Sequence, residues 1–328
     1  MNGRKEFAVL ACRPLSRTFG DMSQSATPLR LGTRGSKLAR VQAEWVRGLL
    51  AARGRPCELV IVKTSGDRIQ DRPLADVGGK GLFTKELEQA LLAHEIDLAV
   101  HSMKDVPVAL PEGLALGAFL PREDPRDAFL SHAAATLEAL PPGARVGTSS
   151  VRRQAQLARA RPDLEIVMLR GNVDTRLAKL DAGDYAAILL AHAGLRRLGL
   201  ADRATSLLAP ENWLPALAQG AVGVEIREDD AATRNAVAPL NDPRTATELV
   251  CERGFQAALD GSCRTPIAGL ARLDGETLGF RGEVLSPDGR DFAATAFAQR
   301  ADGLGEAHRL GFQAGRELRP RAARWLAL

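Results

Sequence analysis

Long apolar runs and aromatic side chains are both scarce in this sequence of 328 residues. No apolar run approaches the roughly 20 residues that a helix needs to cross a bilayer, so we expect no membrane span. Aromatic residues make up only 4%, which leaves few platforms for stacking bases, and no nucleic-acid-binding module is recognisable. We therefore expect a partner that is neither a membrane nor a nucleic acid.

Cysteine and histidine are few and follow no pattern. The four cysteines (Cys12, Cys57, Cys251 and Cys263) form no CxxC pair, and the five histidines show no metal-ligand spacing. These features predict a reducing, cytoplasmic compartment, no disulfide framework and no metal site. The remaining composition, 45% hydrophobic and 26% charged, is ordinary for a globular protein, and the length predicts two or three domains.

Lysine is scarce as well, since only seven of the 44 basic residues are lysine and the rest are arginine. The guanidinium group suits bidentate recognition of carboxylate or phosphate. A biased genomic base composition explains most of such an excess, so only the positions of the arginines can indicate a site.

The first 28 residues show little periodicity and mix basic residues with serine, threonine and proline. We interpret this stretch as a disordered extension, with Met22 as an alternative start of translation. A cleaved targeting peptide fits less well, because Glu6 and Asp21 are unusual in such a segment.

A strand followed by a turn and a helix opens the organised part of the chain. Leu29–Thr33 reads as a strand, and Arg34 then lies between the strand end and the helix start, a position that binds anions. Ser36 is a suitable cap for a helix with an apolar face of Leu38, Val41, Trp45 and Leu49. A glycine-rich loop at 76–83 follows; it contains Lys80 but lacks the spacing of a Walker loop.

Lys104 and Asp105 follow a short buried strand at Leu98–Val100. In an open α/β sheet, ligands bind at the carboxyl ends of the strands. On an extended backbone these two adjacent side chains would point in opposite directions, one towards a cleft and the other into the loop. By themselves, the two residues fit a solvated loop with an incidental ion pair equally well.

Further turns between strands and helices each place an arginine near a helix start. Arg152 and Arg153 follow the cap residues Thr148–Ser150, and Arg176 follows the cap residue Asn172, just after Arg170. Because helix N-termini attract anions, this recurrence favours a cleft that binds several anionic groups over an effect of base composition.

Two crossings of the chain, near 121–127 and 214–221, predict two α/β lobes with a cleft between them. We expect residues 29–121 and 217–240 to form the first lobe, 122–216 the second, and 241–328 a smaller α+β domain. In this third domain Cys251 reads as a buried residue of a helix. Cys263 lies in a Gly-Ser turn beside Arg264, which predicts an exposed thiol with a favoured thiolate.

Seven motifs, in family order, resemble those of the porphobilinogen deaminases, also called hydroxymethylbilane synthases. They are Gly32–Ser36, Val77–Phe83, His101–Pro107, Arg122–Asp127, Gly147–Arg153, Leu169–Leu177 and Gly261–Cys263. The resemblance covers about residues 29–267. It implies two lobes like those of periplasmic binding proteins, the smaller third domain, and a monomer.

The resemblance also implies an activity. Four porphobilinogen molecules would join head to tail with loss of ammonia, giving the linear tetrapyrrole hydroxymethylbilane on a dipyrromethane cofactor held by a thioether to Cys263. Loss of ammonia leaves an electron-poor, azafulvene-type cation. A carboxylate beside the pyrrole N–H would stabilise that charge and move protons, which gives Asp105 the catalytic role.

Other residues are implied as binding groups. For the cofactor they are Cys263, Arg34, Ser102, Lys104, Asp105, Thr148, Ser149, Ser150, Arg152, Arg153, Arg170, Gly171 and Asn172. For the substrate they are Arg34, Lys80, Phe83, Arg170, Arg176 and Gln219. Two departures from the family pattern are Asp76, where some members carry lysine, and Asp260, where glutamate occurs elsewhere.

A two-lobed anion-binding protein without catalysis is the main alternative. It would account for the two lobes and the arginines. It leaves the Cys263 turn and the Lys104–Asp105 pair without a role, and the sequence shows no export signal.

Overall fold

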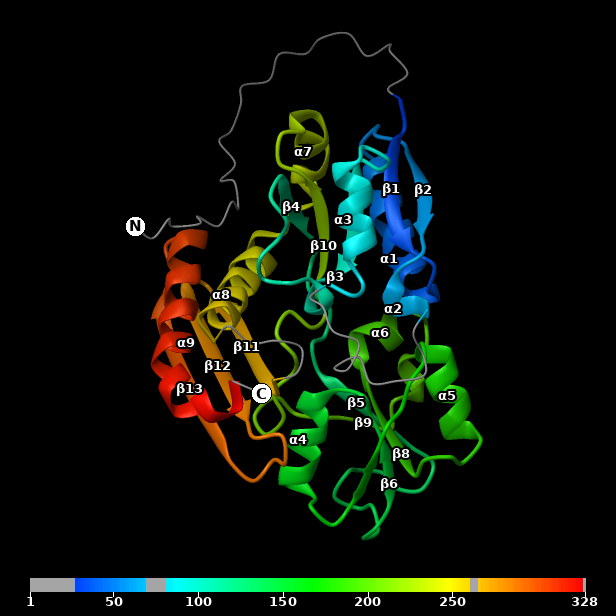
Figure 1. The fold of residues 1–328 in the computed structure, drawn as a ribbon, viewed down its shortest axis with the longest axis vertical. Coiled ribbons are helices and arrows are strands. Elements are labelled where there is room, and N and C mark those ends of the chain that lie inside the picture. The colour runs from blue at the N-terminus through cyan, green and yellow to red at the C-terminus, as the bar shows by residue number, and fades with distance from the viewer. Residues whose placement is uncertain (1–26, 69–80, 260–264, 327–328) are drawn as a thin grey trace.

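The computed structural model describes residues 27–68, 81–259 and 265–326. The predictions for residues 1–26, Asp76, Lys80, Asp260 and Cys263 therefore lie outside the described residues. Within these ranges the chain forms three sheets, with the first at the top of Figure 1, the second at the bottom and the third at the left.

The first lobe is a five-stranded sheet covered by helices. Its strands lie in the order β2 (Cys57–Val62), β1 (Leu29–Arg34), β3 (Leu98–Ser102), β10 (Val222–Arg227) and β4 (Leu114–Phe119). Its helices are α1 (Lys37–Ala51), α2 (Ser65–Arg68), α3 (Lys85–Leu92) and α7 (Ala231–Val237). The strands β1, β2 and β3 are parallel, whereas β10 runs antiparallel to both of its neighbours.

The second lobe repeats this plan. Its strands lie in the order β7 (Glu165–Val167), β6 (Arg145–Gly147), β8 (Ala187–Ala191), β5 (Asp127–Ser131) and β9 (Ser206–Leu207). Its helices are α4 (Val151–Ala160), α5 (Val173–Asp181) and α6 (His192–Arg197). Here β5 is the antiparallel strand. The first crossing leads into β5 and the second into β10, and these two strands occupy equivalent places in their sheets.

The two crossing segments lie side by side. The Leu120 N–H donates to the Val222 carbonyl and the Glu123 N–H to that of Gly220. Gly220 has a φ of +91°, and a Cβ at this position would lie 2.3 Å from the Glu123 carbonyl oxygen. Glycine is therefore required where the returning segment passes the outgoing one.

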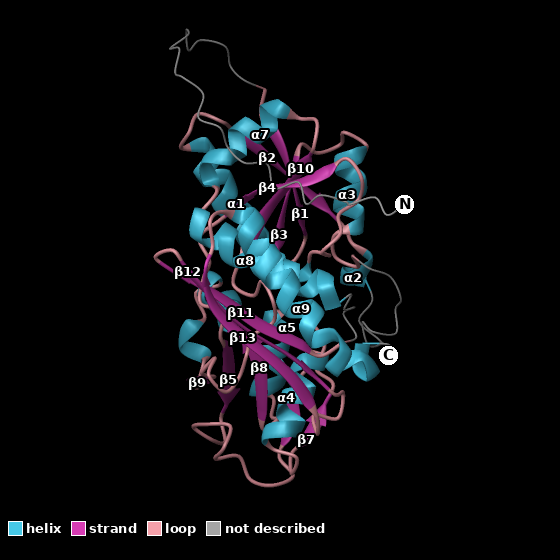
Figure 2. Ribbon diagram, turned by 90° about the vertical axis from the view of Figure 1, so that its left-hand side faces the viewer, coloured by secondary structure: helices cyan, strands magenta, loops and turns pink. Residues whose placement is uncertain are grey.

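The third domain is a three-stranded antiparallel sheet with two helices. Its strands are β11 (Ile267–Asp274), β12 (Thr277–Leu285) and β13 (Phe292–Arg300), and its helices are α8 (Pro243–Leu259) and α9 (Leu304–Leu326). Figure 2 shows α8 in the middle of the molecule, between the first lobe and the third sheet. Cys251 of α8 is fully buried, as predicted.

The predicted class, two α/β lobes with a smaller α+β domain, is confirmed by this arrangement of sheets and helices. We propose 29–121 with 217–240, 122–216 and 241–328 as the limits of the three domains. No helix among the described residues is both long enough and apolar enough to cross a membrane.

The apolar face predicted for α1 is wrong by about one residue. Ala39, Gln42, Ala43, Val46 and Leu50 are buried, whereas Val41 and Trp45 are about one-third exposed. This orientation places Ala43, Val46 and Leu50 in the apolar core and lets the buried Gln42 amide donate to Ser102 Oγ at 2.9 Å. Trp45 instead lies near the second lobe, with its ring 5.9 Å from the Arg197 guanidinium.

Close packing of α9 on α8 gives a test of the third domain. A Cβ at Gly311 would lie 2.0 Å from the Cys251 carbonyl oxygen, which belongs to helix backbone and cannot move aside. Gly311→Ala is therefore expected to lower the free energy of unfolding by about 1–3 kcal/mol, measured by denaturant unfolding.

Gly305→Ala, on the same helix, is the matched control, because nothing lies within 4 Å of its added Cβ. Helix propensity predicts an unchanged or slightly higher stability, by no more than about 1 kcal/mol. Equal losses in the two variants would contradict the packing argument.

Candidate active site

The stretch after β3 is a single 3₁₀ turn, Met103–Asp105, and not the extended backbone expected from the sequence. Met103 is buried, and its N–H donates to the Ala221 carbonyl at 3.0 Å. The side chains of Lys104 and Asp105 are both exposed. Met103 thus fixes the turn to the crossing segment and leaves its two charged neighbours accessible.

A buried arginine of the third domain holds the loop that follows. Arg253 of α8 donates to the carbonyl oxygens of Val106, Pro107 and Val108 at 3.3, 2.9 and 3.0 Å. Burial lowers the pKa of Arg253 to about 10, against the opposing charge of Glu225. The helix that leads towards Cys263 is therefore bonded directly to the loop beside Asp105.

The neighbouring Glu252 of α8 is fully buried and joins the third domain to the crossing segments. Its carboxylate accepts from the Arg122 guanidinium at 2.7 and 3.2 Å and from the Ala271 N–H at 2.8 Å. It also accepts from the Ala218 N–H. Charged groups to which the sequence assigned no role thus hold the three domains together.

The arginine pair at the start of α4 surrounds one buried carboxylate. Asp127, the first residue of β5, has no exposed surface, and its oxygens lie 2.8 Å from Arg152 Nη1 and 2.7 Å from Arg153 Nη2. Trp213 Nε1 and Gln219 Nε2 donate to it at 2.9 and 2.8 Å. We call these five residues the Asp127 cluster.

The electrostatics of Asp127 explain how this cluster tolerates burial. Burial alone would raise its pKa, but the Arg152 and Arg153 charges outweigh that effect and hold the pKa well below its usual range. Two positive charges against one negative leave a net positive cluster. Both arginines are buried, and the Nε–H group of each lacks a partner among the described residues.

Further charged residues from both lobes converge beside the cluster. Burial lowers the pKa of Arg176 to about 10; Arg153 and Arg170 lower it further, and Asp105 opposes them. Asp105 of the first lobe is therefore near enough to affect the charge of Arg176 in the second lobe. We name Lys104, Asp105, Arg153, Arg170 and Arg176 the inter-lobe site.

Lys104 is the one lysine of this site. Its side chain is exposed, and partial loss of the water around its ammonium group lowers its pKa to about 8. Asp105 and Asp127 oppose the shift, whereas Arg152 and Arg153 add to it. Together with Lys104 these groups carry three positive charges against two negative ones, an excess that suits an anion-binding site.

The hydroxyl and amide residues predicted to bind the cofactor lie at the ends of the strands and the starts of the helices. Ser150 Oγ caps α4, and Asn172 Oδ1 caps α5 by accepting from the Thr175 N–H at 2.9 Å. Ser149 Oγ lies 3.5 Å from Arg176 Nη2, while the Gly171 carbonyl accepts from Arg176 Nε at 2.8 Å. The buried Thr148 Oγ1 accepts from the Ser150 N–H at 3.2 Å.

Arg34 and Phe83 are brought together as a pair in the first lobe. The Arg34 guanidinium lies 4.1 Å from the centre of the Phe83 ring, within the range of a cation–π contact. Gln219 is placed differently, because it is buried and its amide donates to Pro125 and Asp127. A direct substrate contact for Gln219 stays a prediction.

Several residues of the site were missed by sequence reasoning. Asp127, Gln156, Trp213, Glu252 and Arg253 all make buried polar contacts that position it. The one available signal was an aspartate directly before the apolar run Ala128–Leu130, since a buried carboxylate must have partners.

The residues present fit a cofactor that carries several carboxylates. Guanidinium and ammonium groups converge from both lobes, and two buried arginine N–H groups remain available as donors. Carboxylates bind such groups by charge-assisted hydrogen bonds. In the part of the chain that the structure describes, no cluster of three His, Cys, Asp or Glu residues could hold a metal ion.

Two α/β lobes that share a cationic site, braced by a third domain, define a class of two-lobed anion-binding proteins. Residues 29–235 match the model of the porphobilinogen deaminase dipyrromethane cofactor-binding domain, and residues 246–319 match that of the porphobilinogen deaminase C-terminal domain. The chain belongs to the porphobilinogen deaminase family.

Two named relatives support this assignment, and a solved structure of low similarity is also found. The porphobilinogen deaminase of Paracoccus denitrificans is 52% identical over 92% of this chain and 96% of its own length. That of Nitrobacter hamburgensis is 55% identical over 89% and 93%. A nutrient binding protein from Burkholderia cenocepacia bound to methionine shows a TM-score of 0.41 with 13% identity, over 66% of this chain and 93% of its own.

Family membership confirms three predictions made from the sequence: the resemblance itself, a transferase activity in tetrapyrrole synthesis, and the dipyrromethane cofactor. The non-catalytic alternative is not favoured.

The lowered pKa of Lys104 predicts a pH dependence. Above about pH 8 this lysine loses its charge in the free enzyme, so binding of a carboxylate substrate weakens and kcat/KM falls. In Lys104→Arg the guanidinium stays charged, so the alkaline fall should move to higher pH. The measurement is the pH profile of kcat/KM, with Lys85→Arg on α3 as the control; an unchanged alkaline limb in Lys104→Arg would contradict the assignment.

Proposed function

We propose that this chain joins four porphobilinogen molecules head to tail, with Asp105 as the catalytic carboxylate and the cations of the inter-lobe site as its carboxylate-binding groups. The observation that supports this most directly is that Asp105 of the first lobe acts on the charge of Arg176, together with Arg153 and Arg170 of the second lobe. Binding groups for anionic side chains and a carboxylate for a cationic reaction centre thus lie in one place.

Substrate recognition follows from charge. Each porphobilinogen carries an acetate and a propionate, so a growing chain brings several carboxylates into the site. Arg170, Arg176 and Lys104 would bind these groups, with Arg34, Phe83, Lys80 and Gln219 as the further predicted contacts. Guanidinium forks suit this task because they bind carboxylates with two parallel hydrogen bonds.

Catalysis requires a negative charge near the ring that loses ammonia. The bond between the aminomethyl carbon and nitrogen breaks, and ammonia leaves with the electron pair. A carbon–carbon bond to the neighbouring pyrrole then forms, and that pyrrole carbon loses a proton. Asp105 would stabilise the transient cation through the pyrrole N–H and accept the proton; carboxylate catalysis of this kind contributes about 10²–10⁴-fold.

The dipyrromethane supplies, when bound, a covalent primer for the first condensation. Besides Cys263, the residues that would hold it are Arg34, Ser102, Lys104, Asp105, Thr148, Ser149, Ser150, Arg152, Arg153, Arg170, Gly171 and Asn172. We further propose that the protein acts as a monomer in the cytoplasm, with porphobilinogen as its small-molecule partner and no nucleic acid or membrane partner.

Asp105→Asn tests the catalytic role. The substitution keeps the shape of the side chain and removes the charge, so kcat should fall by about 10²–10⁴-fold while the thermal unfolding midpoint stays within a few degrees. Asp184→Asn is the control, since this exposed acid precedes β8 at the sheet edge opposite the site. Near-normal turnover in Asp105→Asn would refute the assignment.

Cys263→Ala tests the attachment of the cofactor. The purified variant should fold, lack the dipyrromethane adduct in its intact mass, and show almost no turnover. Cys57→Ala should keep both the adduct and the activity. An adduct on Cys57 or Cys251 in the parent protein would show that the attachment site is wrong.

A further inference from the structure

Helix α4 connects the arginine pair to the third domain through one buried glutamine. Arg152 lies in the first turn of α4, and Gln156 lies on the same face one turn later. Arg152 Nη1 donates to Gln156 Oε1 at 2.7 Å and to the Leu214 carbonyl at 3.1 Å. Gln156 therefore holds the same Nη1 group of Arg152 that also contacts Asp127 at 2.8 Å.

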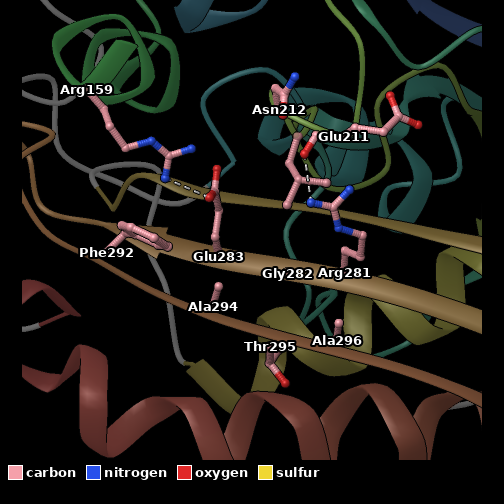
Figure 3. A pocket seen from close by; sticks show the side chains of 11 residues that line it. Arg159, Glu211, Asn212, Arg281, Gly282, Glu283, Phe292, Ala294, Thr295 and Ala296 are labelled. Carbon is pink, nitrogen blue, oxygen red and sulfur yellow. Dashed lines mark hydrogen bonds and ion pairs between the residues drawn. The ribbon is translucent and has the colours of Figure 1, made fainter.

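The amide nitrogen of Gln156 is in turn fixed by two acceptors. It donates to the Leu214 carbonyl at 2.9 Å and to Glu283 Oε1 at 3.1 Å. Glu283 lies on β12 of the third domain and is 5% exposed. Figure 3 shows its carboxylate pointing to Arg159, whose Nη1 donates to Glu283 Oε2 at 3.0 Å.

These contacts allow only one orientation of the Gln156 amide. With its nitrogen towards Glu283 and Leu214, its oxygen must face Arg152, where an acceptor is needed. The flipped amide would set its oxygen against two acceptors and its NH₂ group against a guanidinium. Buried polar groups without partners are costly, so Glu283 and the Leu214 carbonyl together disfavour the flip.

We propose that Glu283 is a positioning residue: it orients the Gln156 amide so that Gln156 holds the Arg152 guanidinium in its binding geometry. This inference rests on the proposed role of Arg152 in binding carboxylates. The sheet of the third domain would then influence the Arg152 guanidinium through Gln156 of α4, independently of Cys263.

The ion pair with Arg159 is not the essential contact. Arg159 is partly exposed and also lies 4.7 Å from the Phe292 ring, so its own charge stays in contact with solvent if it releases Glu283. Gln156 has no such freedom, being 1% exposed. The acceptor that Glu283 offers to Gln156 therefore matters more than its charge, and variants can separate the two.

The experiment compares Glu283→Leu, Glu283→Gln and Arg159→Met in the full chain carrying its cofactor. Leucine removes the acceptor, glutamine keeps an acceptor and removes the charge, and Arg159→Met removes only the ion pair. The measurements are KM and kcat for porphobilinogen, the fraction of protein that carries the dipyrromethane mass, and the thermal unfolding midpoint. Glu283→Met replaces Glu283→Leu if the latter fails to fold.

We expect Glu283→Leu to raise KM about 3–10-fold with kcat within twofold, because Arg152 is proposed to fix the cofactor, beside which porphobilinogen binds in the ground state and the transition state alike. The fraction loaded with cofactor should fall as well. Glu283→Gln and Arg159→Met should stay within twofold of the parent in both respects. Gln156→Leu should reproduce the effect of Glu283→Leu, and the double variant should be no worse than either, because both act through one contact.

Two results would overturn the inference. One is a Glu283→Leu variant with a lower unfolding midpoint but unchanged KM and cofactor loading, which would make the contact structural only. The other is an equal loss in Glu283→Gln, which would make the charge decisive. Arg152→Lys separates the two proposals: if it leaves KM and loading unchanged, the role of Arg152 fails and this inference fails with it. If it raises KM while Glu283→Leu does not, only the positioning role fails.

Discussion

The carboxylate of Asp127, at the start of β5, is fully buried. It binds the guanidiniums of Arg152 and Arg153, the indole N–H of Trp213 and the side-chain amide of Gln219. Removing one partner from a buried ion pair typically costs about 3–5 kcal/mol, so these groups are required together. The partners come from α4 and from the returning segment that contains Trp213 and Gln219. The buried Asp127 carboxylate therefore links β5 to α4 and to the returning segment, and it fixes the positions of Arg152 and Arg153.

The third domain contributes to the same site from the other side. Consecutive residues of α8 face different parts of the molecule: Glu252 binds Arg122 and Ala218, and Arg253 binds the loop after Asp105. Glu283 reaches the second lobe through Gln156. The domain that contains Cys263 in its sequence is therefore bonded both to the loop after Asp105, the proposed catalytic carboxylate, and to the helix of the arginine pair. This bracing suits a reaction in which a tethered chain must meet both.

Much of the architecture could be predicted from local patterns. Ser36, Ser150 and Asn172 cap helices as their side-chain chemistry requires. The two crossings and the arginines near the helix starts also follow from the order of residues along the chain. The face of α1 and the turn at Lys104 could not be predicted in this way. The buried Gln42 amide donates to Ser102 of β3, and the Met103 N–H donates to the Ala221 carbonyl. Both partners are distant in the sequence.

The sequence by itself determined the family, the chemistry of the candidate groups and the positions of most helices and strands, because these depend on residue types at short separations. Only the tertiary structure decided which arginines share a carboxylate, which face each helix buries and how the third domain reaches the site. Those outcomes depend on contacts between residues 26 to 127 positions apart, such as Arg153 with Asp127 and Gln156 with Glu283. Burial makes each such contact specific, because a polar group removed from water destabilises the fold unless a hydrogen-bonding partner lies beside it.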